Sequence, residues 1–167
     1  MSAYRQPPPA ERRGAPGPLQ RPGSPPRMPE PHGKLPDGYL KDGYFDGKGN
    51  LRAELVVDEA SRVAQIIGQK QGQAELKAAQ LRRFYGKAKN IEQKLDSAQT
   101  FETVRPEILS LQPMAANAVA RGTAPDVFKD FIDRNVCLAA KDEKHFRSGF
   151  LVHFQSVVAY FTYFFRR

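Results

Sequence analysis

The chain has 167 residues, with 26 Lys and Arg against 18 Asp and Glu, a formal net charge of +8 and a single cysteine, Cys137. This length is that of one ordinary domain. One cysteine forms neither an internal disulfide nor a cysteine-rich zinc cage, which excludes a small secreted, disulfide-bonded fold. The N-terminus is rich in Pro and Arg and has no apolar run of signal-peptide length, so we expect a cytoplasmic protein. Residues 149–165 carry no charge, but the run is short and polar side chains interrupt it, so we expect a buried helix and no membrane contact.

The composition divides the chain into three parts. Eleven of the 14 prolines and eight of the 13 glycines precede Leu51. Residues 1–36 have almost nothing apolar to bury, which predicts a disordered Pro/Arg-rich arm. Its Pro runs could dock on an aromatic groove, its arginines could contact RNA without specificity, or the arm could be a plain tail, and we favour the tail. Residues 37–50 form a Gly/Asp-rich turn segment that should lead Tyr44 and Phe45 onto a helical bundle domain at residues 51–167.

Hydrophobic periodicity predicts helices over residues 51–69, 73–95, 100–121, about 123–138 and 142–165. The fold class is therefore all-α, a compact bundle of about five helices preceded by the disordered arm. We expect a break in the third helix at Pro113, an N-cap at Thr123 and a buried Cys137. The last helix is rich in phenylalanine and should lie at the centre of the core, with His145 at the surface and His153 at its rim.

The second predicted helix has an unusually basic face. Residues 73–95 contain six basic and two acidic side chains. At about 100° per residue, the cations cover one broad solvent-facing surface, with Tyr85 among them. A solvated face is the ordinary interpretation, but the shortage of nearby carboxylates favours a polyanionic partner such as RNA. Tyr85 either stacks on a base or packs at the edge of the apolar seam. The candidate residues on this helix are Arg82, Arg83, Tyr85, Lys87 and Lys89, with Lys94 further along.

The sequence contains no pattern that predicts catalysis. His145 and His153 lie about 80° apart around their helix and belong to no metal-binding motif. There is no phosphate-binding loop, no nucleophile elbow and no cysteine with a recognisable base nearby. We therefore expect neither catalytic residues, nor a metal site, nor a cofactor.

Three sequence strings point to a family. They are QLRRFY at residues 80–85, LQPMAANAVAR at 111–121 and QSVVAY at 155–160. In this order and spacing they resemble the small subunit of the type III-A CRISPR effector, the Csm complex. The resemblance extends over residues 43–161 and leaves the arm unexplained.

The resemblance implies an all-helical, non-catalytic protein of antiviral defence, present in several copies along a ribonucleoprotein filament. Its partners would be guide and target RNA, other type III-A effector subunits and further copies of itself. In this family the small subunits line the groove where target RNA pairs with the guide, and they contact RNA mainly through its backbone. Arg82 and Arg83 match the basic pair of the family, and Arg121 matches the arginine that closes the Ala-rich helix.

Other candidate residues rest on weaker grounds. Lys87 and Lys89 are candidates from the helical face alone. Met114 stands where the family usually has Lys, and Asn117 where it usually has Tyr, so the resemblance supports neither a phosphate contact nor an aromatic contact at these positions. The alternative function is a helical assembly protein whose aromatic C-terminal helix mediates subunit contacts, with RNA binding incidental.

Overall fold

The structure is a computed structural model that describes residues 33–165, and every regular element in this range is a helix apart from two isolated β-bridges. Three pairs of elements follow each other almost directly, namely α1 with α2, α4 with α5, and η1 with α7. The described chain thus has five helical stretches, which confirms the predicted all-α bundle. The elements are α1 (Ala53–Val56), α2 (Asp58–Gly68), α3 (Ala78–Asp96), α4 (Phe101–Leu109), α5 (Leu111–Ala120), α6 (Asp126–Ala139), the π-helix η1 (His145–Leu151) and α7 (Val152–Phe164).

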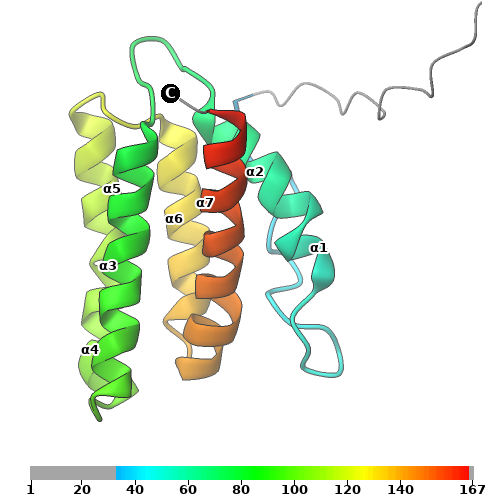
Figure 1. The fold of residues 1–167 in the computed structure, drawn as a ribbon, viewed down its shortest axis with the longest axis vertical. Helices are drawn as coiled ribbons and strands as arrows, with labels where there is room; N and C mark the ends of the chain where they lie inside the picture. The colour runs from blue at the N-terminus through cyan, green and yellow to red at the C-terminus, as the bar shows by residue number, and fades with distance from the viewer. Residues whose placement is uncertain (1–32, 166–167) are drawn as a thin grey trace, which may run out of the picture. The chain divides into compact units, whose positions relative to one another are not determined.

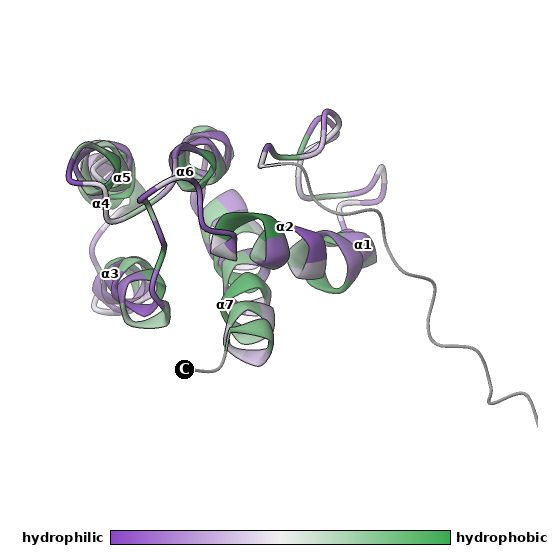
Figure 2. Ribbon diagram, turned by 90° about the horizontal axis from the view of Figure 1, so that it is seen from above, coloured by the Kyte–Doolittle hydropathy of each residue, from purple (hydrophilic) through white to green (hydrophobic). Residues whose placement is uncertain are grey.

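The helices pack around the C-terminal stretch. α7 packs most extensively against α2 and also against α3, while α6 packs against α5 and η1. In Figure 1, α3 and α7 run along the length of the bundle, and α4 and α5 follow one another. Seen from above, α3 and α5 lie to one side of α6 and α7, and α1 and α2 lie to the other (Figure 2). This order places α3 and α5 on the same side of the bundle.

The core consists of the predicted apolar seams. Phe146, Phe150, Phe154 and Phe161, from η1 and α7, are all buried, as expected of a central helix. The spacing of threes and fours in α3 also buries the side chains it predicts. These are Leu81, Phe84, Ala88, Ile91 and Leu95.

Two helix boundaries differ from the prediction. The third predicted helix breaks at Ser110 rather than at Pro113. Pro113 is the third residue of α5, where a backbone amide has no partner inside the helix, so the proline costs no hydrogen bond there. α3 begins at Ala78 rather than near Gln73, because residues 71–74 form a bridged turn in which Gly72 has a φ of 59°.

Two predictions near α6 are wrong. Thr123 is not an N-cap, because α6 begins only at Asp126, and the Thr123 hydroxyl donates instead to the Ala118 carbonyl at 3.0 Å. Cys137 is exposed rather than buried. Asn135, Val136 and Ala139 turn inward on α6, which leaves Cys137 on the outer face of the helix.

The turn segment is tied to the bundle by a buried polar network. Tyr44 is fully buried, as expected, and its hydroxyl donates to the Asn135 side-chain oxygen at 2.9 Å. The Asn135 amide donates in turn to the Tyr39 hydroxyl at 2.8 Å. The Tyr44 ring leaves no space at Gly149 of η1, where an added Cβ would lie 2.4 Å from a ring carbon. Glycine at this position therefore allows the segment to lie against the last helical stretch.

His153 completes this network and is fully buried, so its predicted place at the rim is wrong. Its Nδ1–H donates to the Leu55 carbonyl at 2.6 Å, and its Nε2 accepts the Tyr39 hydroxyl at 2.7 Å. Burial lowers the pKa of His153 to about 4. The histidine is thus a neutral link between α7, α1 and the turn segment.

The predicted disordered arm lies outside the described residues as far as His32. Its last residues, from Gly33, are described, and Leu35 is buried among the core side chains. The packed part of the chain therefore includes a residue that the sequence assigns to the arm.

Candidate nucleic-acid interface

The predicted basic surface of α3 divides into two lines. Arg83 lines a pocket together with residues of α5, and Lys94, three turns further along, pairs with Glu107 of α4 at 2.6 Å. Arg82 lines a different pocket, next to Phe161 of α7. Lys87 lies in line with Arg83, and Lys89 in line with Arg82, because their spacings of four and seven residues return to the same side of a helix. The two lines therefore face different neighbours across the helix.

Two of these cations already have partners. Lys89 forms an ion pair with Glu92, and this hydrogen bond raises the pKa of Lys89. Lys94 is paired with Glu107, a counter-charge from another helix that the α3 sequence alone does not reveal. Both ammonium groups are partly neutralised within the protein, so they are weaker candidates for binding a phosphate.

Four of the predicted candidate residues have a positive charge that no described carboxylate compensates. None of the four has an ion pair or a side-chain hydrogen bond with another of the described residues 33–165. Three of them are exposed and Lys87 is half-buried. A cation with no internal counter-ion is available to an external anion, and these four are the strongest part of the predicted site. They are Arg82, Arg83, Lys87 and Arg121.

Tyr85 packs within the protein. Its ring meets Phe154 of α7 edge-on, with ring centroids 5.6 Å apart and planes at 83°. Partial burial raises the pKa of the Tyr85 hydroxyl. Of the two interpretations of Tyr85, the structure favours packing at the edge of the seam over stacking on a base.

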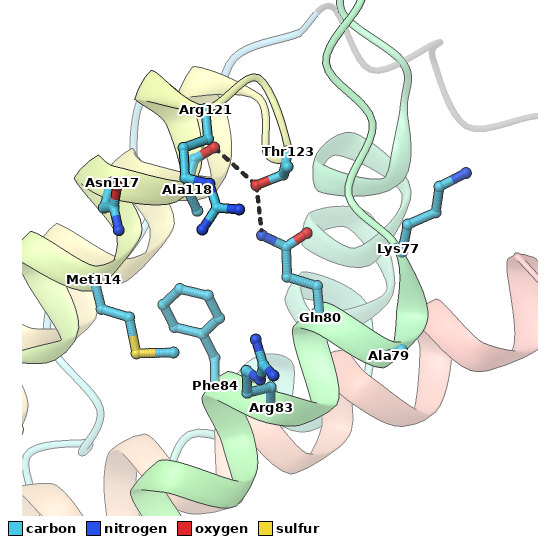
Figure 3. Close-up of a pocket in the computed structure, with 10 residues that line it drawn as sticks. All are labelled: Lys77, Ala79, Gln80, Arg83, Phe84, Met114, Asn117, Ala118, Arg121 and Thr123. Atoms are coloured by element: carbon cyan, nitrogen blue, oxygen red, sulfur yellow. Dashed lines mark hydrogen bonds between the residues drawn. The ribbon is translucent and has the colours of Figure 1, made fainter.

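A pocket of about 490 Å³ lies between α3 and α5 and brings Arg83 and Arg121 together (Figure 3). Arg121 is the residue at which α5 ends, and its side chain extends toward α3. Phe84 and Met114 lie next to each other below it. The predicted candidates that the fold brings to one place are thus Arg83 and Arg121, which are 38 positions apart in the sequence.

Short polar side chains close one end of the pocket. The Gln80 amide donates to the Thr123 hydroxyl at 3.1 Å, and that hydroxyl donates to the Ala118 carbonyl at 3.0 Å. This chain holds the start of α3 against the end of α5. Gly122, with a φ of 66°, turns the backbone sharply after Arg121. Glycine adopts this left-handed conformation without a steric penalty, because it has no Cβ.

Lys77 contributes little positive charge to the pocket, although it is one of the lining residues. It lines the pocket, but its ammonium group pairs with Glu75 at 3.0 Å and points away from the other lining side chains (Figure 3). Ala79, in the first turn of α3, also lines the pocket. The backbone N–H groups of a first helical turn lack intrahelical partners, so the helix end adds a weak attraction for anions near Arg83.

Sequence reasoning missed most of the pocket lining. Gln80 and Thr123 gave no signal as site residues, because they meet only when α3 and α5 pack together. Met114 and Asn117 were not predicted as site residues either, because they depart from the residues usual in the resembling family, yet both line this pocket.

Metal-binding side chains do not cluster in the described part of the chain. No group of three or more His, Cys, Asp and Glu residues in it lies close enough together to hold a metal ion. His145 is engaged with Asp142, its Nδ1 lying 2.8 Å from a carboxylate oxygen. None of the described helices combines the length and the hydropathy needed to cross a membrane.

Comparison with models of known protein families identifies the family of this chain. A family model described as Csm2 Type III-A matches residues 50–166. The chain belongs to this family. It is therefore a small subunit of the type III-A CRISPR effector, the Csm complex, and assembles with other subunits of that complex. Neither the curated proteins nor the solved structures gave a significant match. The match covers every residue of the pocket between α3 and α5, and it leaves out the arm and most of the turn segment.

Proposed function

We propose that this Csm2-family subunit holds target RNA in the guide/target groove through contacts with the RNA backbone. Arg83 and Arg121 are the central contacts, with Lys87 beside Arg83 on α3 and Arg82 on the neighbouring line. Base pairing with the guide supplies sequence recognition, so the protein needs only to hold phosphates in place. In this proposal the subunit works in the cytoplasm, in several copies and without catalysis of its own.

The observation that carries the proposal is that two arginines without an ion pair, one in α3 and one at the end of α5, line the same pocket. Arg147, by contrast, pairs with Asp96 at 2.7 Å and with Glu143 at 2.7 Å. Arg83 and Arg121 instead line one opening with no carboxylate among the pocket residues. Arginine forms bidentate hydrogen bonds with phosphate oxygens, so this pair suits an RNA backbone.

The salt dependence of RNA binding tests this proposal. The purified full chain should bind single-stranded RNA with an affinity that falls steeply with salt, by about 0.7 in log K per log unit of salt for each neutralised phosphate. Replacing the four uncompensated cations with glutamine should reduce that slope by up to about 3. Fluorescence anisotropy titrations at four or more salt concentrations measure it. The variant is Arg82→Gln, Arg83→Gln, Lys87→Gln and Arg121→Gln together.

A charge-matched variant is the control. It removes four exposed lysines that lie outside the proposed surface and have no ion pair with described residues, so its net charge equals that of the first variant. It should keep most of the salt slope. If both variants lose the same slope, binding follows net charge alone and the proposed surface is wrong. The control substitutions are Lys41→Gln, Lys48→Gln, Lys70→Gln and Lys141→Gln.

The C-terminal helix favours a second candidate function, assembly through aromatic contacts. Tyr163 is 67% exposed, and Phe164 is also exposed. Tyr160 and Tyr163 line an apolar pocket of about 440 Å³ between α7 and α1. The four-glutamine variant separates the two candidates. If assembly is the only role, this variant should retain full function in the effector complex, because the aromatic surface contains none of the four cations.

A further inference from the structure

The pocket between α3 and α5 is larger than a phosphate contact requires. A single phosphate on two arginines needs only an exposed cationic surface, whereas this pocket has a volume of about 490 Å³. Volumes of roughly 300–1,000 Å³ are typical of sites that hold a small organic molecule. The pocket is therefore large enough for a ligand with a substantial body next to its charge.

The floor of the pocket is apolar and partly rigid. Phe84 is 2% exposed and held edge-on against Phe128 with centroids 4.9 Å apart, so it supports the floor from beneath, and the half-buried Met114 supplies the accessible apolar surface. Met114 lies beside Phe84 in Figure 3, and its flexible thioether can adapt to the shape of a ligand. A flat aromatic ring system fits such a floor better than a bare anion does, because the anion would leave the apolar surface unused.

Hydrogen-bonding groups stand at the edge of this floor. Asn117 lines the pocket, and its side-chain amide has no hydrogen bond within the described residues, so it offers both donors and an acceptor. The Gln80 amide is already oriented by its hydrogen bond to Thr123. Free and oriented amides next to an apolar floor are typical of surfaces that contact the polar edge of a nucleobase.

We propose that the pocket holds one unpaired nucleotide of a bound RNA, with its phosphate on Arg83 and Arg121 and its base against Met114. This proposal rests on the proposed function, since it needs an RNA backbone at the two arginines. It adds that the site accepts a nucleotide that stands out of the paired helix. An acidic peptide would also bind the arginines, but it would leave the apolar floor and the Asn117 amide without a role.

Two RNA duplexes of equal charge test the proposal. Both carry one single-nucleotide bulge at the same position, and the bulge holds adenine in one probe and an abasic site in the other. The full-length protein should bind the adenine probe at least about 5-fold more tightly, because the base adds an apolar contact with Met114 and hydrogen bonds with the Asn117 amide. Anisotropy titrations at one fixed salt concentration measure the ratio of the two affinities.

Variants of the floor and edge should lower this ratio. Asn117→Trp places a large ring at an exposed pocket position, so it should block the base and bring the ratio close to 1. Met114→Gln keeps the size of the side chain and makes the floor polar, so it should lower the ratio as well. Gln155→Trp, at an exposed amide of α7 outside the pocket, is the matched control and should keep the ratio.

The outcomes distinguish the two proposals. A ratio near 1 for the unmodified protein, or an unchanged ratio in Asn117→Trp and Met114→Gln, would overturn the nucleotide pocket while leaving the backbone contact intact. A ratio near 1 together with displacement of both probes by a glutamate-rich peptide would assign the pocket to an acidic protein partner instead. Failure of the unmodified protein to bind either probe would contradict the proposed function itself.

Discussion

At the scale of single residues, His153 links structure to pH. Its ring is fully buried, and both ring nitrogens are used in hydrogen bonds to neutral groups. Protonation would place a proton on Nε2, the atom that accepts the Tyr39 hydroxyl, and would bury a charge without a counter-ion. Desolvation therefore lowers the pKa of His153 to about 4, against about 6.5 in an unfolded chain.

This difference predicts how stability depends on pH. Since the folded pKa is the lower one, the unfolded chain binds more protons between pH 6.5 and 4, and stability falls as the pH falls through this range. The stabilising contribution of His153 is complete above pH 6.5, and about 3 kcal/mol of stability is lost between pH 6.5 and pH 4. Urea unfolding at pH 7.5, 6.0, 5.0 and 4.5 measures it, with His153→Gln as the comparison. Equal pH dependence in both proteins would show that His153 is not the group responsible.

Single residues also show what sequence alone can predict about the site. Arg83 and Arg121 were predicted, one from its helical face and both from the family resemblance. Gln80 and Thr123 were not, because a hydrogen bond between residues 43 positions apart is created by packing and leaves no periodic signal. The same holds for His153, whose partner Tyr39 lies 114 positions away.

At the scale of elements, helical periodicity predicts the buried faces better than the helix ends. The α3 seam and the phenylalanines of the last stretch lie where the pattern places them. The break at Ser110 and the late start of α3 depend on local backbone geometry, which hydrophobic spacing does not record. Hydrophobic spacing also fails to predict the π-helical turn of η1, since residues 142–165 have the pattern of one continuous helix.

The fit of η1 against the turn segment gives a prediction about stability. Gly149→Ala should destabilise the protein by about 1–3 kcal/mol, because the added methyl group would overlap the buried Tyr44 ring. Gly86→Ala, in the interior of α3 with open space around it, should stabilise the protein by about 0.5–1 kcal/mol through helix propensity. Urea unfolding of the two variants measures both effects. A neutral Gly149→Ala variant would mean that the turn segment does not pack tightly against η1.

At the scale of the whole molecule, the excess charge has a defined location. Half of the net charge of +8 comes from residues 1–34, nearly all of which lie outside the described residues, and the other half from residues 73–95. Within that second block, Lys77, Lys89 and Lys94 are paired with carboxylates. What remains for an external partner is Arg82, Arg83 and Lys87, to which the fold adds Arg121 from α5.

The central claim, that RNA lies across Arg83 and Arg121, is tested most directly by crosslinking in the assembled complex. A type III-A effector reconstituted with the full-length subunit would be loaded with target RNA containing 4-thiouridine, irradiated and analysed by peptide mass spectrometry. We predict crosslinks in residues 80–87 of α3 and 114–121 of α5. Crosslinks confined to α6 or to the outer face of α7, with none on α3 or α5, would contradict the claim.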